Sequence, residues 1–199
     1  MNPLFHFPEI STARLRLRQP RMNDADALFS YRSRDDFSAV ARVPRFTHKW
    51  EAEAHIFTTL QGYYQQKKVC WFIELIDGSP VVGSVSLLAM KDDSIGSSHR
   101  LEISSEISPE YRSKGLATEA KKAIISWAFL VFPSLRRIHS EIAASNTASI
   151  HVNEKLGFQK EGRLRAFEAQ EGDVVVMSFL REDQTEPNKA LVPKPTAQL

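Results

Sequence analysis

Hydrophobic and polar residues alternate along the chain with two different periods. In residues 13–19, Leu15 and Leu17 stand between arginines, and this two-residue period predicts a strand with one face in water. Short apolar runs bounded by turn residues predict further strands at 69–76, 81–89, 100–108, 136–142 and 173–180. Asp77-Gly78, between the first two of these runs, is typical of a hairpin.

Apolar residues at near-helical spacing predict helices between the strands. Residues 48–68 and 114–132 carry the longest such patterns, and Pro133 ends the second. The apolar positions are Trp50, Ala54, Phe57, Leu60 and Tyr64 in the first, and Leu116, Ala120, Ala123, Ile124, Trp127 and Val131 in the second. Shorter helices are predicted within 22–34 and 146–158. This order of elements indicates a mixed sheet with helices on its faces.

Composition excludes several classes of protein. The 199 residues suffice for one domain with a core, and a formal charge of +2 is too small to indicate nucleic acid as a partner. Cys70 is the single cysteine, so no internal disulfide can form, which fits a cytoplasmic location. No signal-peptide pattern is present and no apolar run approaches roughly 18 residues, so no membrane contact is expected. Residues 182–199 are polar with three prolines, which predicts a disordered tail after a single domain of residues 1–181.

The stretch RSKGLAT, residues 112–118, lies between a predicted strand and a predicted helix. The first N–H groups of a helix lack internal partners, and the helix dipole adds about half a positive charge there. Gly115 permits a close backbone approach to a ligand, while Arg112 and Lys114 add positive charge. The stretch suits a pyrophosphate, and a plain turn with solvated cations is the alternative. It lacks the glycine patterns of P-loops and dinucleotide folds, which disfavours nucleotide hydrolysis and hydride transfer.

Three segments together resemble one family. Arg-x-x-Gly-x-Ala at 112–117 is similar to the acyl-CoA pyrophosphate loop of the GNAT N-acetyltransferases. Residues 146–158 resemble the Asn-x-x-Ser…Glu-Lys-x-Gly-Phe helix and turn of that superfamily. Residues 10–29 resemble the opening of its RimJ/RimL-like branch, the ribosomal-protein N-terminal acetyltransferases and their relatives. The resemblance spans about residues 10–181 and implies the GNAT fold (α+β or α/β), with a mixed central sheet of about six to seven strands and helices on both faces.

The resemblance implies direct transfer of an acetyl group to a primary amine, with acetyl-CoA as co-substrate, no metal, and a monomer or homodimer. The favoured acceptor is the α-amine of a protein or peptide N-terminus. An α-amine has a pKa near 7.7–8.0 and lysine near 10.4, so neutralising them at pH 7 costs roughly 1 and roughly 4–5 kcal/mol. A modest base therefore suits an α-amine. A small-molecule amine (a drug, polyamine or metabolite) and a non-catalytic CoA-binding module are the alternatives.

The resemblance also assigns binding residues by position. It places the pantetheine arm along the strand at 102–108, beside a splay or bulge near Ser104–Ser105 that frees a backbone N–H for the oxyanion. Here the chain has Glu102-Ile103-Ser104-Ser105, whereas the branch commonly has Glu-Ile-Gly-aromatic. The residues assigned to CoA are Ile107, Ser108, Arg112, Ser113, Lys114, Gly115, Leu116, Ala117, Thr118, Asn146, Ser149 and Asn153.

Three residues are candidates for the proton transfers. Ser149 matches the serine that donates a proton near the CoA sulfur, and simple helix capping by Asn146 with a solvated Ser149 is the alternative. Glu168 matches the position of the base in the ribosomal branch and ranks first, and Glu102 ranks second. Glu106 shares a strand face with Glu102 by two-residue alternation, so it is a further candidate.

Overall fold

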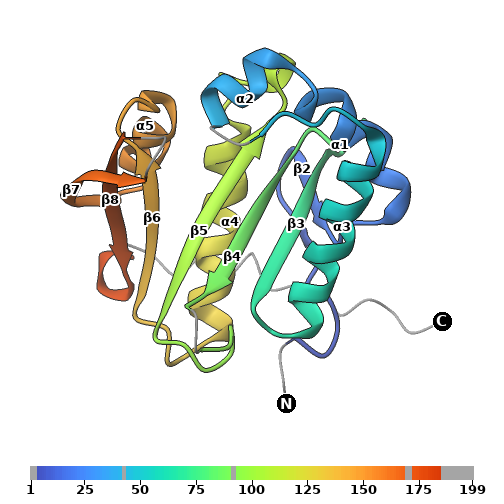
Figure 1. Cartoon of the computed structure of the whole chain (residues 1–199). Helices are drawn as coiled ribbons and strands as arrows, with labels where there is room; N and C mark the ends of the chain where they lie inside the picture. The colour runs from blue at the N-terminus through green and yellow to red at the C-terminus, as the bar shows by residue number, and fades with distance from the viewer. Residues whose placement is uncertain (1–3, 42–43, 91–92, 169–171, 185–199) are drawn as a thin grey trace.

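A twisted sheet of eight strands forms the centre of the computed structural model, which describes residues 4–41, 44–90, 93–168 and 172–184 (Figure 1). The strand order across the sheet is β1-β2-β3-β4-β5-β6-β8-β7. All neighbouring strands run antiparallel except β5 and β6, which run parallel. The strands are β1 (Ile10–Ser11), β2 (Leu15–Arg18), β3 (Lys68–Leu75), β4 (Gly83–Ala89), β5 (Arg100–Ile107), β6 (Arg137–Ala143), β7 (Gln159–Glu168) and β8 (Gly172–Leu180).

Helices cover both faces of the sheet. They are α1 (Ala25–Arg32), α2 (Asp35–Ala41), α3 (Lys49–Tyr64), α4 (Leu116–Val131) and α5 (Thr147–Lys155). Figure 1 shows α3 in front of β3 and α4 behind β4 and β5. Three-residue 3-10 turns lie at Met22–Asp24, Pro109–Tyr111 and Arg181–Asp183. The predicted mixed sheet with helices on its faces is therefore confirmed.

Two-residue alternation in β3 divides the core into two clusters. Val69, Trp71 and Ile73 point to the α4 side, where the rings of Trp71 and Trp127 meet edge to face at 5.3 Å. Cys70 and Phe72 point to the opposite side and pack with α1 and α3. Because both faces of β3 are buried, its sequence reads as a continuous apolar run.

The sheet has more strands than the predicted six to seven. The sequence reading misses β1, which pairs only two residues with β2. It also leaves open whether one strand or a pair closes the chain, because β7 is a polar edge strand without apolar alternation. Helix α2 is a further element that the apolar spacing does not predict.

The predicted helix at 48–68 is confirmed as α3, but its apolar stripe faces solvent except at Leu60, which is half-buried against the core. The side chains that pack on the sheet are Ala52, Ile56, Thr59 and Tyr63. Trp50, Phe57 and Tyr64 are 61%, 61% and 76% exposed. The sequence period was right for a helix, and the sheet covers the other face.

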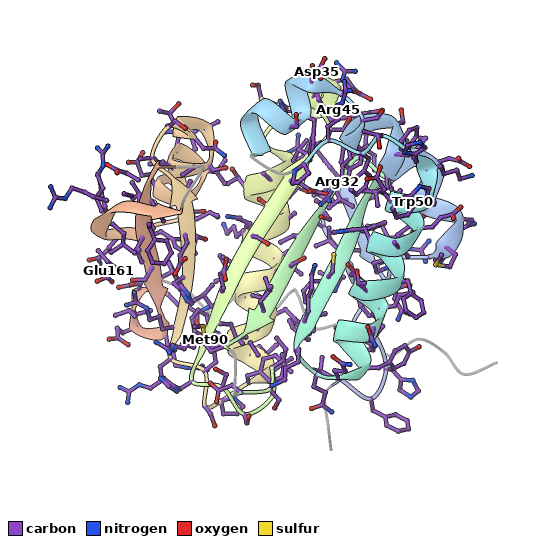
Figure 2. The ribbon with its side chains drawn as sticks, in the orientation of Figure 1. Arg32, Asp35, Arg45, Trp50, Met90 and Glu161 are labelled. Carbon is purple, nitrogen blue, oxygen red and sulfur yellow. The ribbon has the colours of Figure 1, made fainter. Side chains whose placement is uncertain are left out.

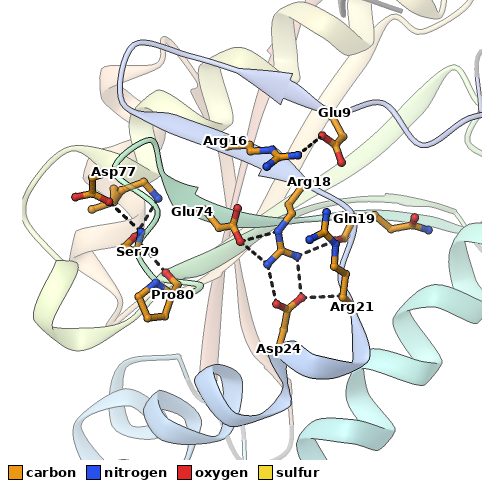
Figure 3. A network of polar contacts seen from close by, with 11 residues as sticks. Glu9, Arg16, Arg18, Gln19, Arg21, Asp24, Glu74, Asp77, Ser79 and Pro80 are labelled. Carbon is orange, nitrogen blue, oxygen red and sulfur yellow. Dashed lines mark hydrogen bonds and ion pairs between the residues drawn. The ribbon is translucent and has the colours of Figure 1, made fainter. Parts of the chain in front are cut away.

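Arg18 holds the start of α1 against the sheet. Its guanidinium, 3% exposed, pairs with Asp24 at 2.7 Å and with Glu74 of β3 at 2.5 Å (Figure 3). Asp24 also accepts a hydrogen bond from the backbone N–H of Arg21 at 2.7 Å. A buried guanidinium with two carboxylates and good geometry fixes α1, which carries Tyr31 and Arg32 into the site described below.

The described chain ends beside the last turn of α4. Arg181 donates hydrogen bonds to the backbone carbonyls of Phe129, Phe132 and Leu135 at 2.7–2.9 Å. These include carbonyls that α4 itself leaves without partners at its C-terminus. Of the predicted tail, residues 182–184 belong to this ordered end, and residues 185–199 lie outside the described residues, so that prediction stays open.

Candidate functional site

The parallel strands β5 and β6 diverge near the middle of the sheet (Figure 1). Their backbones pair only along three residues, where 100–102 of β5 lie opposite 137–139 of β6. A cavity of about 290 Å³ opens beyond this point. It is lined by Arg32, His55, Lys68, Cys70, Ser84, Ser86, Ile103, Ser104, Ser105, Glu106, Ser140, Glu141, Ile142, Ala143, Asn146 and Ser149.

The expected splay is present, whereas the alternative bulge is absent from the β4 side. β5 pairs with β4 in an unbroken register from Leu101 to Ile107, through Ser104 and Ser105. The divergence lies instead on the β6 side, where the hydroxyl of Ser140 donates to the carbonyl of Ile103 at 2.8 Å. The serines replace the usual Gly and aromatic residue without distorting the strand.

The loop before α4 has the backbone conformation of an anion-binding turn. Ser113 and Gly115 both adopt the left-handed region, with φ of 61° and 77°. Among the described residues, none accepts a hydrogen bond from the backbone N–H groups of residues 113–118. Consecutive N–H groups in such a turn at a helix N-terminus form a concave site for an anion.

Cations surround this loop unevenly. Lys114 is exposed, and its ammonium lies 4.8 Å from the ring centre of Tyr111. Arg112 points away from the loop, because its guanidinium donates to the carbonyls of Ile107 and Asp36 at 3.2 and 3.0 Å. The side chain of Arg112 thus ties the loop to β5 and α2, and its assigned contact with CoA stays a prediction.

Arg14 is a cation at the loop that sequence reasoning missed. Its guanidinium donates to Glu119 in the first turn of α4 at 2.7 Å and to the carbonyl of Lys114 at 3.0 Å. Its backbone N–H and the hydroxyl of Thr12 also donate to the same carboxylate, at 3.0 and 2.6 Å. The β1–β2 segment therefore fixes the loop and neutralises the one carboxylate of that turn.

Helix α5 brings Asn146 and Ser149 to the cavity. The side-chain oxygen of Asn146 accepts from the backbone N–H of Ser149 at 3.1 Å, so Asn146 caps the helix as predicted. The cap fixes the first turn, and both residues line the cavity. The capping alternative and the proposed role of Ser149 are thus compatible.

Asn153, one turn further along α5, is fully buried. Its side-chain oxygen accepts a hydrogen bond from the ammonium of Lys121 on α4 at 2.9 Å, and its amide nitrogen has no partner in the described part of the chain. Burial lowers the pKa of Lys121 to about 8, although nearby Glu102 raises it. The side chain of Asn153 therefore joins α5 to α4, and contact with CoA stays a prediction.

Glu106 lies inside the cavity in a three-residue network. Arg32 contacts both carboxylate oxygens, at 3.2 and 2.5 Å, and the hydroxyl of Tyr31 donates to one of them at 2.8 Å. Burial favours the neutral acid, but the charge of Arg32 and these hydrogen bonds outweigh it and lower the pKa of Glu106 below its usual value. A carboxylate held in this way is a weak proton acceptor.

Neither of the two carboxylates that the sequence analysis ranked highest as the base is found at the cavity among the described side chains. Glu102 is paired with β4 and β6 just before the strands diverge, and it is absent from the described residues that line the cavity. The backbone of Glu168 pairs with Gly172 at the end of β7, but its side chain lies outside the description. Both assignments stay predictions.

Glu141 and His55 are cavity residues that sequence reasoning missed. Glu141 is exposed, lines the cavity from β6, and within the described ranges has no ion pair or hydrogen bond of its carboxylate. Two-residue alternation with the buried Ile142 gave a signal for this orientation. His55 approaches from α3, where burial and the charge of Arg32 lower its pKa to about 4. No local signal pointed to His55, because it depends on how α3 packs.

No described helix combines the length and apolar character needed to cross a membrane. No group of three or more metal-binding side chains occurs in the part of the chain that the structure describes.

Comparisons with known proteins agree with this geometry. Residues 14–159 match the family model of the acetyltransferase (GNAT) domain. The uncharacterized N-acetyltransferase YoaA of Bacillus subtilis is 32% identical over 83% of this chain and 91% of its own length. The spermidine N(1)-acetyltransferase of Escherichia coli is 36% identical, over 50% of this chain and 56% of its own length.

The fold has close counterparts among solved structures. Mycobacterium smegmatis RimJ, determined in complex with CoA-disulfide, superimposes with a TM-score of 0.77 over 94% of this chain and 93% of its own, at 21% identity. The GNAT fold predicted from the sequence is thus confirmed. Since the family model spans more than half of the chain, the protein belongs to the GNAT acetyltransferase family and is an N-acetyltransferase.

Proposed function

We propose that the protein transfers the acetyl group of acetyl-CoA to the α-amine of a protein or peptide N-terminus. One observation carries this proposal: β5 lines the cavity at the β5–β6 divergence and leads, through the 3-10 turn at Pro109–Tyr111, to the N–H groups of residues 113–118, which have no acceptor among the described residues. This arrangement offers an anion site and a reaction chamber along one path.

The chain's own residues fit acetyl-CoA at both ends of this path. The backbone N–H groups of residues 113–118 and the ammonium of Lys114 bind the pyrophosphate. Ile107, Ser108 and Asn146 lie along the pantetheine route. Acetyl-CoA supplies an acetyl thioester, whose carbonyl the acceptor amine attacks. Ser149 holds the proton that the thiol leaving group takes up.

The cavity favours an amine that arrives mostly neutral. Glu106 and His55 are both weak bases there, since burial and then the charge of Arg32 lower the pKa of His55, and Arg32 with its hydrogen bonds lowers the pKa of Glu106 against the effect of burial. Glu141 is the cavity carboxylate that we assign to take up the amine proton, in addition to the candidates Glu168 and Glu102. An α-amine loses its proton near pH 8, about 2.5 pH units below lysine, so it needs less from the base.

A small polyamine is the second candidate acceptor. The spermidine N(1)-acetyltransferase of Escherichia coli shares 36% identity with half of this chain. The exposed carboxylate of Glu141 suits the additional ammonium group of a polyamine.

Release of free thiol from acetyl-CoA tests the two candidate acceptors together. The acceptor panel contains peptides with free N-termini, the same peptides with blocked N-termini and an internal lysine, and spermidine. We expect turnover with free N-termini that is at least tenfold faster than with the blocked peptides. Faster turnover with spermidine supports the second candidate, and hydrolysis without transfer to any member of the panel contradicts both.

Two substitutions test the assigned roles. Ser149→Ala lowers kcat at least tenfold and leaves the Kd for CoA within about twofold, because the hydroxyl acts only in the reaction. Glu141→Gln lowers kcat/KM and shifts its pH profile upward. Equal loss of turnover and CoA affinity in Ser149→Ala would point to a binding role instead.

A further inference from the structure

The cavity has a polar floor on the face of the sheet that α1 and α3 cover. Short side chains on β3, β4 and β5 form it, and the strand register places them in two cross-strand rows. The first row is Cys70, Ser86 and Ser104, and the second is Phe72, Ser84 and Glu106. All of them except Phe72 line the cavity. Hydroxyl groups both donate and accept hydrogen bonds, so the charged residues around this floor decide which acceptor it suits.

Lys68 places a positive charge at one end of the floor. It stands on β3 two residues before Cys70, so its side chain points to the same face of the sheet. It is half-buried and lines the cavity, and within the described ranges its ammonium has no ion pair or hydrogen bond. A partly buried charge without a partner costs free energy, which an anion placed beside it would offset.

The other cationic side chains of the cavity are either paired or neutral. Arg32 contacts both carboxylate oxygens of Glu106 at the opposite end of the floor. Figure 2 shows Arg32 near the upper ends of the central strands. His55 is uncharged at pH 7, because burial, and then the charge of Arg32, lower its pKa to about 4. Among the described lining residues, Lys68 is therefore the one that offers an unpaired positive charge at neutral pH.

The reactive amine and Lys68 lie on different sides of the floor. Glu141, which we assign to take up the amine proton, lines the cavity from β6, beyond the divergence. Lys68 stands on β3, two strands before β5, and two strand spacings are about 10 Å. The flexible four-carbon stem of lysine spans part of this distance. The ammonium of Lys68 can therefore meet a group that lies a few ångströms from the acceptor amine.

We propose that Lys68 binds a carboxylate that the acceptor carries close to its reactive amine, and so selects the acceptor. This inference rests on the proposed function, because it concerns the acceptor of the same reaction. In a peptide, the carboxylate is the side chain of an aspartate or glutamate at the first position. A free amino acid offers the same group as its α-carboxylate. In either case the ammonium gains a charge-assisted hydrogen bond.

Peptides that differ only in their first residue test this selection. They begin with glutamate, glutamine or lysine, and free glutamate is the fourth acceptor. Thiol release from acetyl-CoA gives kcat/KM for each. Wild-type kcat/KM is expected to be at least tenfold higher for the glutamate-first peptide than for the glutamine-first peptide, and lowest for the lysine-first peptide, whose ammonium Lys68 repels.

Charge changes at one position make the test specific. Lys68→Met is expected to bring the glutamate-to-glutamine ratio of kcat/KM to within about twofold of one, and Lys68→Glu is expected to favour the lysine-first peptide. Lys67→Glu is the matched control and is expected to keep the wild-type ratio. Lys67 is exposed, donates to the carbonyl of Asp93 at 2.6 Å, and is absent from the described residues that line the cavity. Because both peptides are measured on one preparation, any loss of folded protein cancels in the ratio.

Failure of this inference differs from failure of the proposed function. Equal kcat/KM for the glutamate-first and glutamine-first peptides overturns the role of Lys68 alone, as does a preference that survives Lys68→Met and Lys68→Glu. Absence of transfer to every peptide overturns the proposed function. Free glutamate then decides the role of Lys68: a KM that rises at least tenfold in Lys68→Met supports it, whereas an unchanged KM or no transfer to free glutamate overturns it.

Discussion

Helices α3 and α4 flank opposite faces of one sheet, and each carries an apolar stripe that is visible in the sequence. On α4 the stripe is buried: Leu116, Ala120, Ala123, Ile124 and Trp127 are at most 4% exposed. On α3 the stripe is the exposed side, and the sheet receives Ala52, Ile56, Thr59 and Tyr63. Apolar period thus predicts that a helix forms, whereas the residues opposite the stripe decide which face packs inward.

The two helices also begin differently. The N-terminus of α3 carries a carboxylate of its own, because Glu51 accepts from the backbone N–H groups of Thr47 and His48, just before the helix, at 2.6 and 2.8 Å. Those backbone hydrogen bonds lower the pKa of Glu51. The first turn of α4 begins at Gly115 and keeps its N–H groups open. Of these two helices, only α4 has a terminus ready for an anion.

The largest expected difference concerns stability. Trp127→Ala removes a fully buried ring from the stripe of α4 and is expected to lower the free energy of unfolding by about 3–5 kcal/mol. Phe57→Ala on α3 is expected to change it by less than about 1 kcal/mol, because the ring of Phe57 is 61% exposed. Urea unfolding of both variants measures the contrast. Similar losses would mean that the ring of Phe57 is covered in the folded protein.

The next effect concerns the two helix N-termini. Gly115→Glu is expected to weaken acetyl-CoA binding at least 100-fold, about 2.7 kcal/mol, by placing a carboxylate at a left-handed position within the open turn. Glu51→Gln is expected to leave CoA affinity unchanged. Calorimetry measures both. A Gly115→Glu affinity within about threefold of wild type contradicts the loop assignment.

A third contrast concerns the lysine buried under α4. Asn153→Leu removes the partner of Lys121 and is expected to destabilise the fold by about 2–3 kcal/mol at pH 7. For the double variant Lys121→Leu with Asn153→Leu, the free energy of unfolding is expected to be at least that of wild type and up to about 1–2 kcal/mol higher. A double variant less stable than Asn153→Leu alone would show that the ammonium itself supports the fold.

The wild-type pH profile gives an independent measure of the same lysine. The pKa of Lys121 is lowered to about 8 in the fold, against an ordinary value of 10.5. Between these values the unfolded chain binds more protons, so stability is expected to rise with pH in this window. In the double variant this rise is expected to be reduced.

The last expected effect concerns His55 on α3. Its pKa is lowered to about 4 from an ordinary 6.5, so the unfolded chain binds more protons between these values. Stability is therefore expected to fall by about 3 kcal/mol as pH drops through this window. His55→Gln is expected to flatten the acid side of the profile. An unchanged profile in the variant would assign the acid sensitivity to other groups.

Local pattern predicted the elements of the site but not all of its contacts. The turn at Gly115 and the cap at Asn146 were predicted from the sequence because turn and cap residues act within a few positions of themselves. Ser149 was assigned through the family resemblance, and its role stays a prediction. The pairing of Arg32 and Tyr31 with Glu106 was not, because it joins residues 74 and 75 positions apart through the packing of α1 on β5. The face of α3 that packs on the sheet was missed for the same reason. The apolar period shows that a helix has two faces, but it does not show which of them another element covers.

The hydrogen bonds between Arg14 and Glu119 have a consequence for how the protein is made. The two residues are 105 positions apart in the chain. At roughly 5–20 residues per second, a ribosome adds Glu119 about 5–20 seconds after Arg14. During that interval the nascent chain holds β2 without the helix that it braces. The loop at 112–118 therefore cannot gain this brace until Glu119 has been added, and a truncated product that ends before α4 has no loop to complete.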